Sequence, residues 1–453
     1  MFSIDRRNLG SSQTIGPARL DWGLLALLTL GVLTSLALDD PRRQFQSFAA
    51  ALSVASAAWL ALFLRRSWRS TRFLRWAIGV AIGLRIIGLC TPPAFSDDAF
   101  RYVYEGRVMW ERGLAYPFLR PPRAAAEDGV PEALRDESWL RINHASIPTL
   151  YPPLSAATFA VAAKLGDALG GRHLLALKIL LILAEVLALL VIASIGPGAR
   201  SSVAALALCP LLLLEVAREG HHDALALLGL ALFARGASAM KPALAHGGLA
   251  LASLAKLFAL AIHPLALAWS RRGATIPLVL LGALLLLPAV LGGLGATVGL
   301  RTYAEAWRSG DGAFTLLSLL SERAVGPLGL TIGGQPLRPE LIARALAGLV
   351  FLAFLARLLR QPERPLLEKA QAGLVVLLLL SPTFHPWYAL WLLPLLPFGR
   401  GLAALWLLAL APLFHQAAHH ELVEGTWEIA AGLRALVHLP AWILVVRAER
   451  FLL

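Results

Sequence analysis

Long apolar runs, separated by short polar clusters, dominate the sequence from residue 22 onward. A helix needs about 20 consecutive apolar residues to cross the roughly 30 Å hydrocarbon core of a bilayer. Runs close to that length lie at roughly 22–38, 44–64, 73–92, 173–194, 202–217, 274–293, 341–359, 367–383, 401–415 and 428–446. Shorter runs at 223–234, 243–255, 257–269 and 386–399 are marginal as full spans. The pattern predicts an all-α, polytopic integral membrane protein of about 14 transmembrane helices, folded as a single domain over 1–453.

The composition supports this fold class and excludes others. The chain has 453 residues, of which 58% are hydrophobic and 15% charged, whereas a soluble domain carries about 25% charged residues. A soluble enzyme of two or three domains, a disordered chain and a disulfide scaffold are therefore excluded. Cys90 and Cys209 both lie in apolar runs, so the sequence has no disulfide framework and no zinc-binding spacing.

Arginines define the predicted orientation in the membrane. The net charge is +13, and the 41 basic residues are nearly all arginine. In a soluble protein a pI near 10.6 would suggest nucleic-acid binding. Here the basic residues lie between hydrophobic runs, as they do in the cytoplasmic loops of membrane proteins, so we expect membrane lipids and no nucleic acid as partners. With the N-terminus cytoplasmic, the inside clusters are Arg6, Arg7 and Arg19; the loop 65–72; Arg200; Arg235 with Lys241; Arg271 and Arg272; Arg357, Arg360 and Arg364; Arg400; and Arg447 with Arg450.

This orientation leaves two long segments outside, 93–172 and 294–340. It requires the stretch 151–165 to lie along the outer surface instead of crossing, as its two leading prolines and its short length favour. The first outer segment holds nine acidic residues and seven arginines between Asp97 and Arg141, the densest polar stretch of the chain. Loops held by a rigid scaffold commonly carry chemistry, so we expect the functional site in this segment.

Two adjacent acids, Asp97 and Asp98, open a helical pattern in the first outer segment. An N-cap role, in which a carboxylate accepts N–H groups of the first turn, explains one acid well. It explains two less well, because adjacent like charges repel. The alternative is that one carboxylate is a general base that accepts the proton of an attacking hydroxyl. Arg101 lies four residues after Asp97 and four before Glu105, so all three share one helix face. We expect Arg101 to pair with Asp97 and therefore favour Asp97 as the base.

Five segments, in order along the chain, resemble those of bacterial GT-C glycosyltransferases that use a polyprenyl-phosphate sugar, especially the mannosyltransferase-like group. They are SDDAFRYVYEGRVMWERGLAYPF at 96–118, INHASIPTLYPPLSA at 142–156, EGHHDA at 219–224, KLF at 256–258 and SPTFHPWY at 381–388. A looser version of the same order occurs in the catalytic subunit of the GPI mannosyltransferase. Departures from the usual pattern, at Phe100, Tyr104-Glu105-Gly106, Ala115-Tyr116-Pro117 and His222, leave the sugar and the acceptor open.

The resemblance implies a GT-C fold with surface-lying periplasmic helices, in the bacterial inner (plasma) membrane. It implies transfer of a hexose, with mannose favoured, from a polyprenyl-phosphate donor to an extracytoplasmic glycolipid or glycan acceptor. Asp97 or Asp98 would be the base of an inverting displacement at a site facing the periplasm. No cofactor is required, although some relatives use a divalent metal. The donor-binding candidates are Arg101, Arg107, His144, Tyr151, His221, His222, Asp223, Lys256, His385, Trp387 and Tyr388.

Some of these candidates have a second interpretation. Lys256 interrupts an apolar run, so its ammonium either faces a cavity or a partner, or snorkels to the interface. His144 is either a hydrogen-bonding residue of the loop or part of the site. The stretch 221–223 is either a helix start or a segment that binds the donor or a metal. Adjacent histidines project in different directions, which disfavours a two-histidine metal site, and we assign no metal ligand.

Charged residues elsewhere allow rival functions. Lys178 and Glu185 lie on one face of one apolar run and could line a channel, so a lipid or sugar transporter or flippase is the alternative to glycosyl transfer. We expect Lys178 to snorkel and Glu185 to be buried against a neighbouring helix. A noncatalytic assembly subunit is a third possibility, against which the intact pair of aspartates argues. The cluster His415, His419, His420, Glu421 and Glu424 is either a metal-binding segment or, as we favour, a solvated outer loop.

Overall fold

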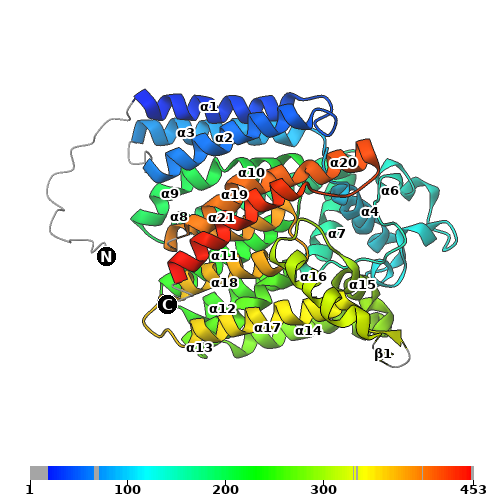
Figure 1. Cartoon of the computed structure of the whole chain (residues 1–453). Helices are drawn as coiled ribbons and strands as arrows, with labels where there is room; N and C mark the ends of the chain where they lie inside the picture. Colours follow the sequence, from blue (N-terminus) through cyan, green and yellow to red (C-terminus); the bar gives the residue numbers. More distant parts are fainter. Residues whose placement is uncertain (1–18, 66–70, 330, 333–334, 400, 450–453) are drawn as a thin grey trace.

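The chain folds into a bundle of helices that run largely side by side, shown in Figure 1 as a computed structural model. The structure describes residues 19–65, 71–329, 331–332, 335–399 and 401–449. The protein is an α-helical membrane protein, as predicted; the described residues add one short hairpin of β1 (Thr331–Ile332) and β2 (Gln335–Pro336), in which Ile332 pairs with Gln335. Parts of the predicted positive clusters lie outside the described residues, namely Arg6, Arg7, 66–70, Arg400 and Arg450.

Within the described residues, eight helices are long and apolar enough to cross a membrane, or nine if a bent pair counts as one span. Their outer faces carry exposed apolar side chains, such as Val279, Val290 and Leu349, which suit contact with lipid. The eight are α1 (Arg19–Ala37), α2 (Phe45–Arg65), α3 (Thr71–Cys90), α8 (His173–Ala193), α14 (Thr275–Gly292) continued by α15 (Val298–Ala306), α17 (Pro339–Leu359), α19 (Leu402–Leu410) continued by α20 (Gln416–Glu424), and α21 (Ala431–Glu449).

The other apolar runs are helical too, but each is shorter than a full span, which explains why the count by length stays below 14. Prolines begin or interrupt most of them and remove backbone donors there. The bent pair turns by 58° at the break before Pro210. These helices are α9 (Pro197–Ala207) with α10 (Pro210–Leu212) and the π-helical turn η4 (Leu213–Arg218), α11 (Asp223–Ser238), α12 (Pro242–Ala255), η5 (Leu257–Ile262), α13 (His263–Trp269), α18 (Leu366–Leu380) and η8 (Pro386–Phe398). The turn η9 (Ala411–His415) joins α19 to α20 within one of the eight spans.

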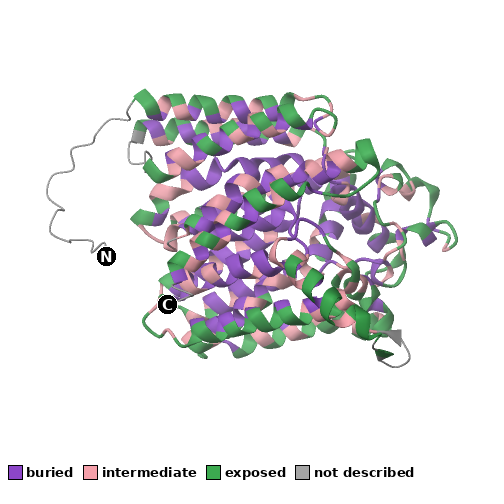
Figure 2. Ribbon diagram, viewed as in Figure 1, coloured by how far each residue is buried: buried purple, intermediate pink, exposed green. Residues whose placement is uncertain are grey.

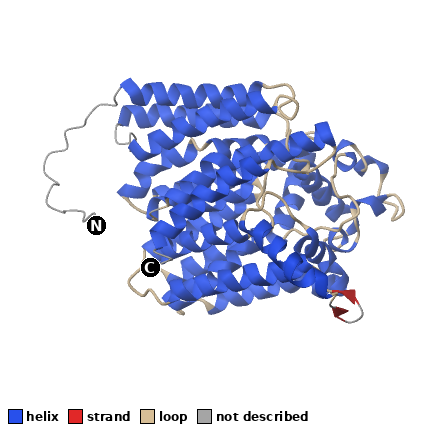
Figure 3. Cartoon of the chain, in the orientation of Figure 1, coloured by secondary structure: helices blue, strands red, loops and turns tan. Residues whose placement is uncertain are grey.

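The two segments predicted to lie outside gather at one end of the bundle, opposite to the start of α1 and the end of α21 (Figure 1). Loops are most extensive at this end (Figure 3). Arginines at the opposite helix ends, such as Arg72 and Arg447, therefore lie away from the polar segments. The polar end is built from α4 (Asp98–Arg112), α5 (Tyr116–Leu119), η2 (Pro122–Ala125), η3 (Glu132–Leu134), α6 (Glu137–Leu140), α7 (Pro153–Ala168), η6 (Gly293–Thr297), α16 (Ala313–Val325) and η7 (Gly326–Leu328).

Close packing fixes α4, the helix that begins with the acidic motif. It lies against α7, the stretch predicted to run along the surface, which is not among the helices that meet the criteria for a span. Gly106 permits the contact, because a Cβ there would lie 2.1 Å from the Phe159 carbonyl oxygen. Gly248 of α12 approaches the backbone of Phe233 in α11 in the same way. The centre of the bundle is mostly buried (Figure 2). Small residues that admit close backbone contact are typical of packed membrane helices.

The two charges inside α8 have different partners. Glu185 is buried, as expected, and accepts hydrogen bonds from the guanidinium of Arg85 in α3. Lys178 does not snorkel: it is 1% exposed, and its ammonium donates to the carbonyls of Gly88, Leu89 and Thr91 at 2.7–3.0 Å. Since the last carbonyls of a helix have no intrahelical donor, Lys178 supplies one at the end of α3.

Candidate active site

A cavity of about 460 Å³ opens at the polar end of the bundle and collects residues that are far apart in the sequence. Its walls come from the acidic motif, the 143–151 stretch, the break after α12, the loop after α15 and the start of η8. Of the thirteen candidate residues, the nine in its lining are Asp97, Asp98, Arg101, His144, Tyr151, Lys256, His385, Trp387 and Tyr388.

Asp98 lies in the first turn of α4 and lines the cavity, half-buried. Its peptide N–H donates to the Ser96 hydroxyl at 3.2 Å, and its carboxylate accepts from the Tyr102 hydroxyl at 3.3 Å. Among the described residues Asp98 forms no ion pair. Asp98 therefore keeps acceptor capacity for a group inside the cavity.

Asp97 occupies the N-cap position of α4, but its side chain makes no capping hydrogen bond. The expected pair with Arg101 is wrong. Asp97 instead accepts from Arg141 at 3.0 Å and lies 3.8 Å from Arg42. Because Asp97 precedes the first helical residue, its carboxylate is not held to the helix face of Arg101, and both of its oxygens have guanidinium partners.

Arg101 pairs with the next acid along the helix. Its guanidinium donates to Glu105 at 2.8 Å and to the Ile147 carbonyl at 2.7 Å. Glu105 also accepts from the Thr149 hydroxyl at 2.8 Å. Burial raises the pKa of Glu105, although its contacts with Arg101 and Thr149 oppose that shift. These contacts tie the stretch around Thr149 to α4 and so shape the cavity wall.

Lys256 provides a cation in the lining of the cavity. The residue interrupts the helical path between α12 and η5 in an extended conformation, and its side chain is 13% exposed. Its ammonium lies 3.3 Å from the Asp223 carboxylate and 5.3 Å from the centre of the Tyr388 ring. Of the two interpretations given above, the arrangement with a partner and a cavity is the one observed.

Aromatic rings form much of the remaining surface of the cavity. His385 stacks on Trp387 with ring centres 4.5 Å apart, and the hydroxyls of Tyr303 and Tyr388 are hydrogen bonded at 2.7 Å. His144 adopts a left-handed φ of 49° and meets the Trp307 ring edge-on at 4.4 Å. Burial lowers the pKa of His144, so its ring is held neutral. The cavity thus combines carboxylates and one ammonium with flat apolar faces.

Four candidate residues lie outside the cavity lining. Arg107 points into the 93–172 segment, where it donates to Asp136 at 2.5 Å and to the Ala133 carbonyl at 2.7 Å. The other three are fully buried beneath the cavity. His221 bonds to Glu215 at 2.9 Å and stacks on Trp387, His222 is enclosed by rings including Tyr102 at 4.9 Å, and Asp223 accepts from Trp391 at 2.8 Å.

The histidine cluster near the C-terminus is not a solvated loop. His419, His420, Glu421 and Glu424 belong to α20, while His415 is buried and bonds to Glu215 at 2.7 Å. Glu215 therefore bridges two histidines, which explains why an acid occurs inside the apolar run 202–217. No group of three or more His, Cys, Asp or Glu side chains in the described part of the chain could hold a metal ion.

The sequence did not point to several residues of the cavity, namely Arg42, Tyr303, Trp307 and Trp427, nor to Arg141 next to it. Glu421, which the sequence grouped with the C-terminal histidines, also lines the cavity. Arg42 carried a signal: with Arg43 it lies on the outer side in the predicted topology, against the usual positive-inside bias. A neighbouring cavity of about 650 Å³ shares Arg42 and Asp97 with the first and is also lined by Arg141. Asp97 and Arg42 thus lie where the two cavities adjoin.

Comparisons with known proteins found no matching family model, no similar curated protein and no similar solved structure. The geometry of the cavity therefore carries the functional argument.

Proposed function

We propose that the protein is an integral membrane glycosyltransferase that moves a hexose, with mannose favoured, from a polyprenyl phosphate to an extracytoplasmic glycolipid or glycan acceptor. The observation that carries the proposal is the convergence of Asp98, Lys256 and the aromatic rings around Trp387 on one cavity, from segments more than a hundred residues apart. The second cavity, which adjoins the first at Asp97, supports a reaction with two substrates.

Asp98 is the base that we favour, in place of Asp97. A general base needs a lone pair within hydrogen-bond reach of the proton that it removes. Asp97 is engaged by Arg141 and Arg42, whereas Asp98 has a single hydroxyl donor, Tyr102, and lines the cavity. In our proposal Asp97 orients the two arginines at the boundary between the cavities, and Asp98 accepts the proton of the acceptor hydroxyl.

The proposed reaction is a single displacement. The acceptor oxygen attacks the anomeric carbon as Asp98 takes its proton, and the bond from that carbon to the phosphate oxygen breaks with its electron pair leaving on the lipid phosphate. Cationic groups are needed where this negative charge develops, and Lys256 and Arg101 are the lining cations suited to that role. The flat faces of Trp387 and Tyr388 suit the apolar faces of a hexose ring.

We further propose a GT-C fold with about 14 crossings, in which the short apolar helices complete spans together with their neighbours. The cavity would face the periplasm of a bacterial inner (plasma) membrane, with the arginine-rich helix ends in the cytoplasm. The donor would then be taken from the outer leaflet. The proposed chemistry needs no cofactor, because every step uses side chains of the cavity.

The test is a transfer assay in proteoliposomes. Purified protein is supplied with labelled polyprenyl-phosphate mannose and a bacterial lipid extract as acceptor. We expect the label to move to a new product while polyprenyl phosphate is released in equal amount. If the labelled donor instead changes leaflet without losing its sugar, the transporter alternative is correct and the proposal is wrong.

A further inference from the structure

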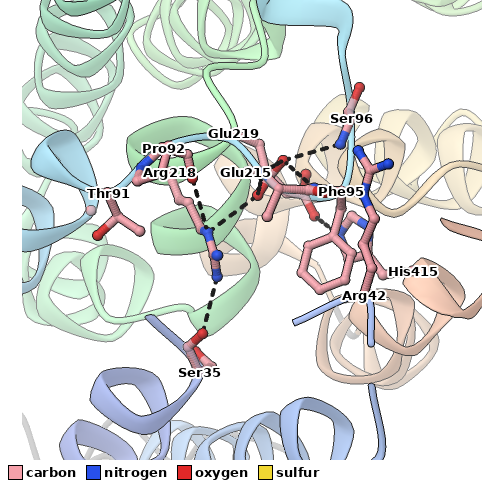
Figure 4. A network of polar contacts seen from close by, with 12 residues as sticks. Ser35, Arg42, Thr91, Pro92, Phe95, Ser96, Glu215, Arg218, Glu219 and His415 are labelled. Atoms are coloured by element: carbon pink, nitrogen blue, oxygen red, sulfur yellow. Dashed lines mark hydrogen bonds and ion pairs between the residues drawn. The ribbon is translucent and has the colours of Figure 1, made fainter. Parts of the chain in front are cut away.

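The segment that leads from α3 to the acidic motif is held on both of its hydrogen-bonding sides by charged side chains, of which Lys178, Arg218 and Glu219 are buried. Lys178 holds the carbonyls at the end of α3, as described above. Arg218, 2% exposed, donates to the Pro92 carbonyl at 3.3 Å and to the Ser35 carbonyl of α1 at 3.0 Å. Arg42 donates to the Ala94 carbonyl. Figure 4 shows this network around Glu219.

Glu219 holds the amide side of the same segment. Its carboxylate accepts the N–H groups of three consecutive residues: Ala94 at 3.1 Å, Phe95 at 2.9 Å and Ser96 at 3.2 Å. Successive peptide N–H groups that converge on one point form an anion-binding nest. Here the anion is a side chain with no solvent exposure, accompanied by Arg218 at 3.5 Å.

The position of the nest in the chain matters because the two residues that follow it are Asp97 and Asp98. The Ser96 hydroxyl accepts the Asp98 N–H and so links the last residue of the nest to the first residue of α4. Glu219 does not line the cavity, so it has no contact with a substrate there. Phe95, between the bonded amides, packs on His415 with ring centres 4.3 Å apart, which further limits rotation of the segment.

We propose that Glu219 is a positioning residue that fixes the carboxylate of Asp98 in the cavity by anchoring residues 94–96. This role rests on the proposed glycosyl transfer. A carboxylate is required because hydrogen bonds to a charged acceptor are roughly twice as strong as neutral ones. The Oε2 atom accepts all three N–H groups, whereas the Oε1 atom lies 3.2 Å from the Ala94 nitrogen and 3.5 Å from the Arg218 guanidinium. A glutamine that kept its oxygen at the Oε2 position would therefore turn its NH₂ group toward the Ala94 N–H and toward Arg218. Aspartate would keep the charge but reach less far by one methylene group.

The experiment compares the full-length parent with Glu219→Gln, Glu219→Asp and a matched control, Glu322→Gln, whose side chain is exposed on α16. The donor is labelled polyprenyl-phosphate mannose, and rates are expressed per folded molecule. Displacement of a reacting group by about 1 Å can lower a rate about 100-fold. For Glu219→Gln we expect kcat to fall by at least about tenfold while KM for the donor stays within about twofold. Glu219→Asp should recover part of kcat, and the control should match the parent.

Hydrogen exchange of the parent protein tests the anchor without activity. The amides of residues 94–96 should exchange much more slowly than those of the exposed residues 126 and 127. Fast exchange at 94–96 would overturn the inference, and would do so even if Glu219→Gln fails to fold. A parental kcat in the folded glutamine variant would overturn it as well. If the parent transfers no sugar at all, the proposed function fails and the catalytic role falls with it, while slow exchange would still report the anchor.

Discussion

The buried ion pair between α3 and α8 offers a quantitative test of how the bundle is held together. Arg85 is 6% exposed and Glu185 1% exposed. The guanidinium donates from Nε to Glu185 at 3.0 Å and also to the Ala81 carbonyl at 2.9 Å. Removing one partner leaves an uncompensated buried charge, which typically costs about 3–5 kcal/mol, whereas replacing both by apolar side chains of similar size is often neutral.

We therefore expect Arg85→Met and Glu185→Met each to lower the free energy of unfolding by about 3–5 kcal/mol. The double variant should be close to the parent, so that the two single effects sum to far more than the double effect. The assay is reversible denaturant unfolding in mixed micelles, followed by tryptophan fluorescence. If the double variant lost as much stability as the two single variants together, Arg85 and Glu185 would act independently, and the predicted coupling between them would be wrong.

Two further variants test local contacts of the fold. Lys178→Met should destabilise the protein by about 1–3 kcal/mol or more because it leaves carbonyls of α3 without a donor, while Lys164→Met, at an exposed position of α7, should have little effect; thermal unfolding in detergent distinguishes them. Gly106→Ala should destabilise the protein by about 1–3 kcal/mol through the clash with Phe159. Its control is Gly83→Ala in α3, where the added Cβ would meet nothing within 4 Å, and this variant should be neutral or stabilising. If Lys178→Met and Lys164→Met, or Gly106→Ala and Gly83→Ala, changed the thermal stability equally, the contact assigned to Lys178 or to Gly106 would be wrong.

The apolar pattern predicts where the helices lie, and the number of crossings depends on how the shorter helices combine. Each long apolar run forms a helix because apolar side chains over many residues leave the backbone no other way to satisfy its hydrogen bonds in lipid. Prolines shorten or bend several of the described helices, as at Pro210 and at Pro386, which begins η8, so that only eight or nine reach the length of a span by themselves. Hydropathy averages over such breaks and so overstates the continuous length of a helix.

The site was predictable in its parts and not in its pairings. Asp98 and Lys256 were identified as chemically unusual for their positions, and both line the cavity. The partners of Asp97 and Glu219 could not be predicted from the sequence, because they are distant in the chain. Arg141 lies 44 residues from Asp97, and the 94–96 amides lie about 125 residues from Glu219. The helical spacing that suggested Asp97 with Arg101 treats Asp97 as part of the helix, and it lies just before the first turn.

The transfer rate of Asp98→Asn, measured with saturating polyprenyl-phosphate mannose beside the parent and Asp97→Asn, tests most directly whether Asp98 is the base of a glycosyltransferase. Asparagine preserves the shape of the side chain but cannot take the proton. Since a general base contributes about 10²–10⁴-fold, we expect a loss of at least about 100-fold for Asp98→Asn and a smaller loss for Asp97→Asn. Transfer by Asp98→Asn at the rate of the parent would contradict this assignment.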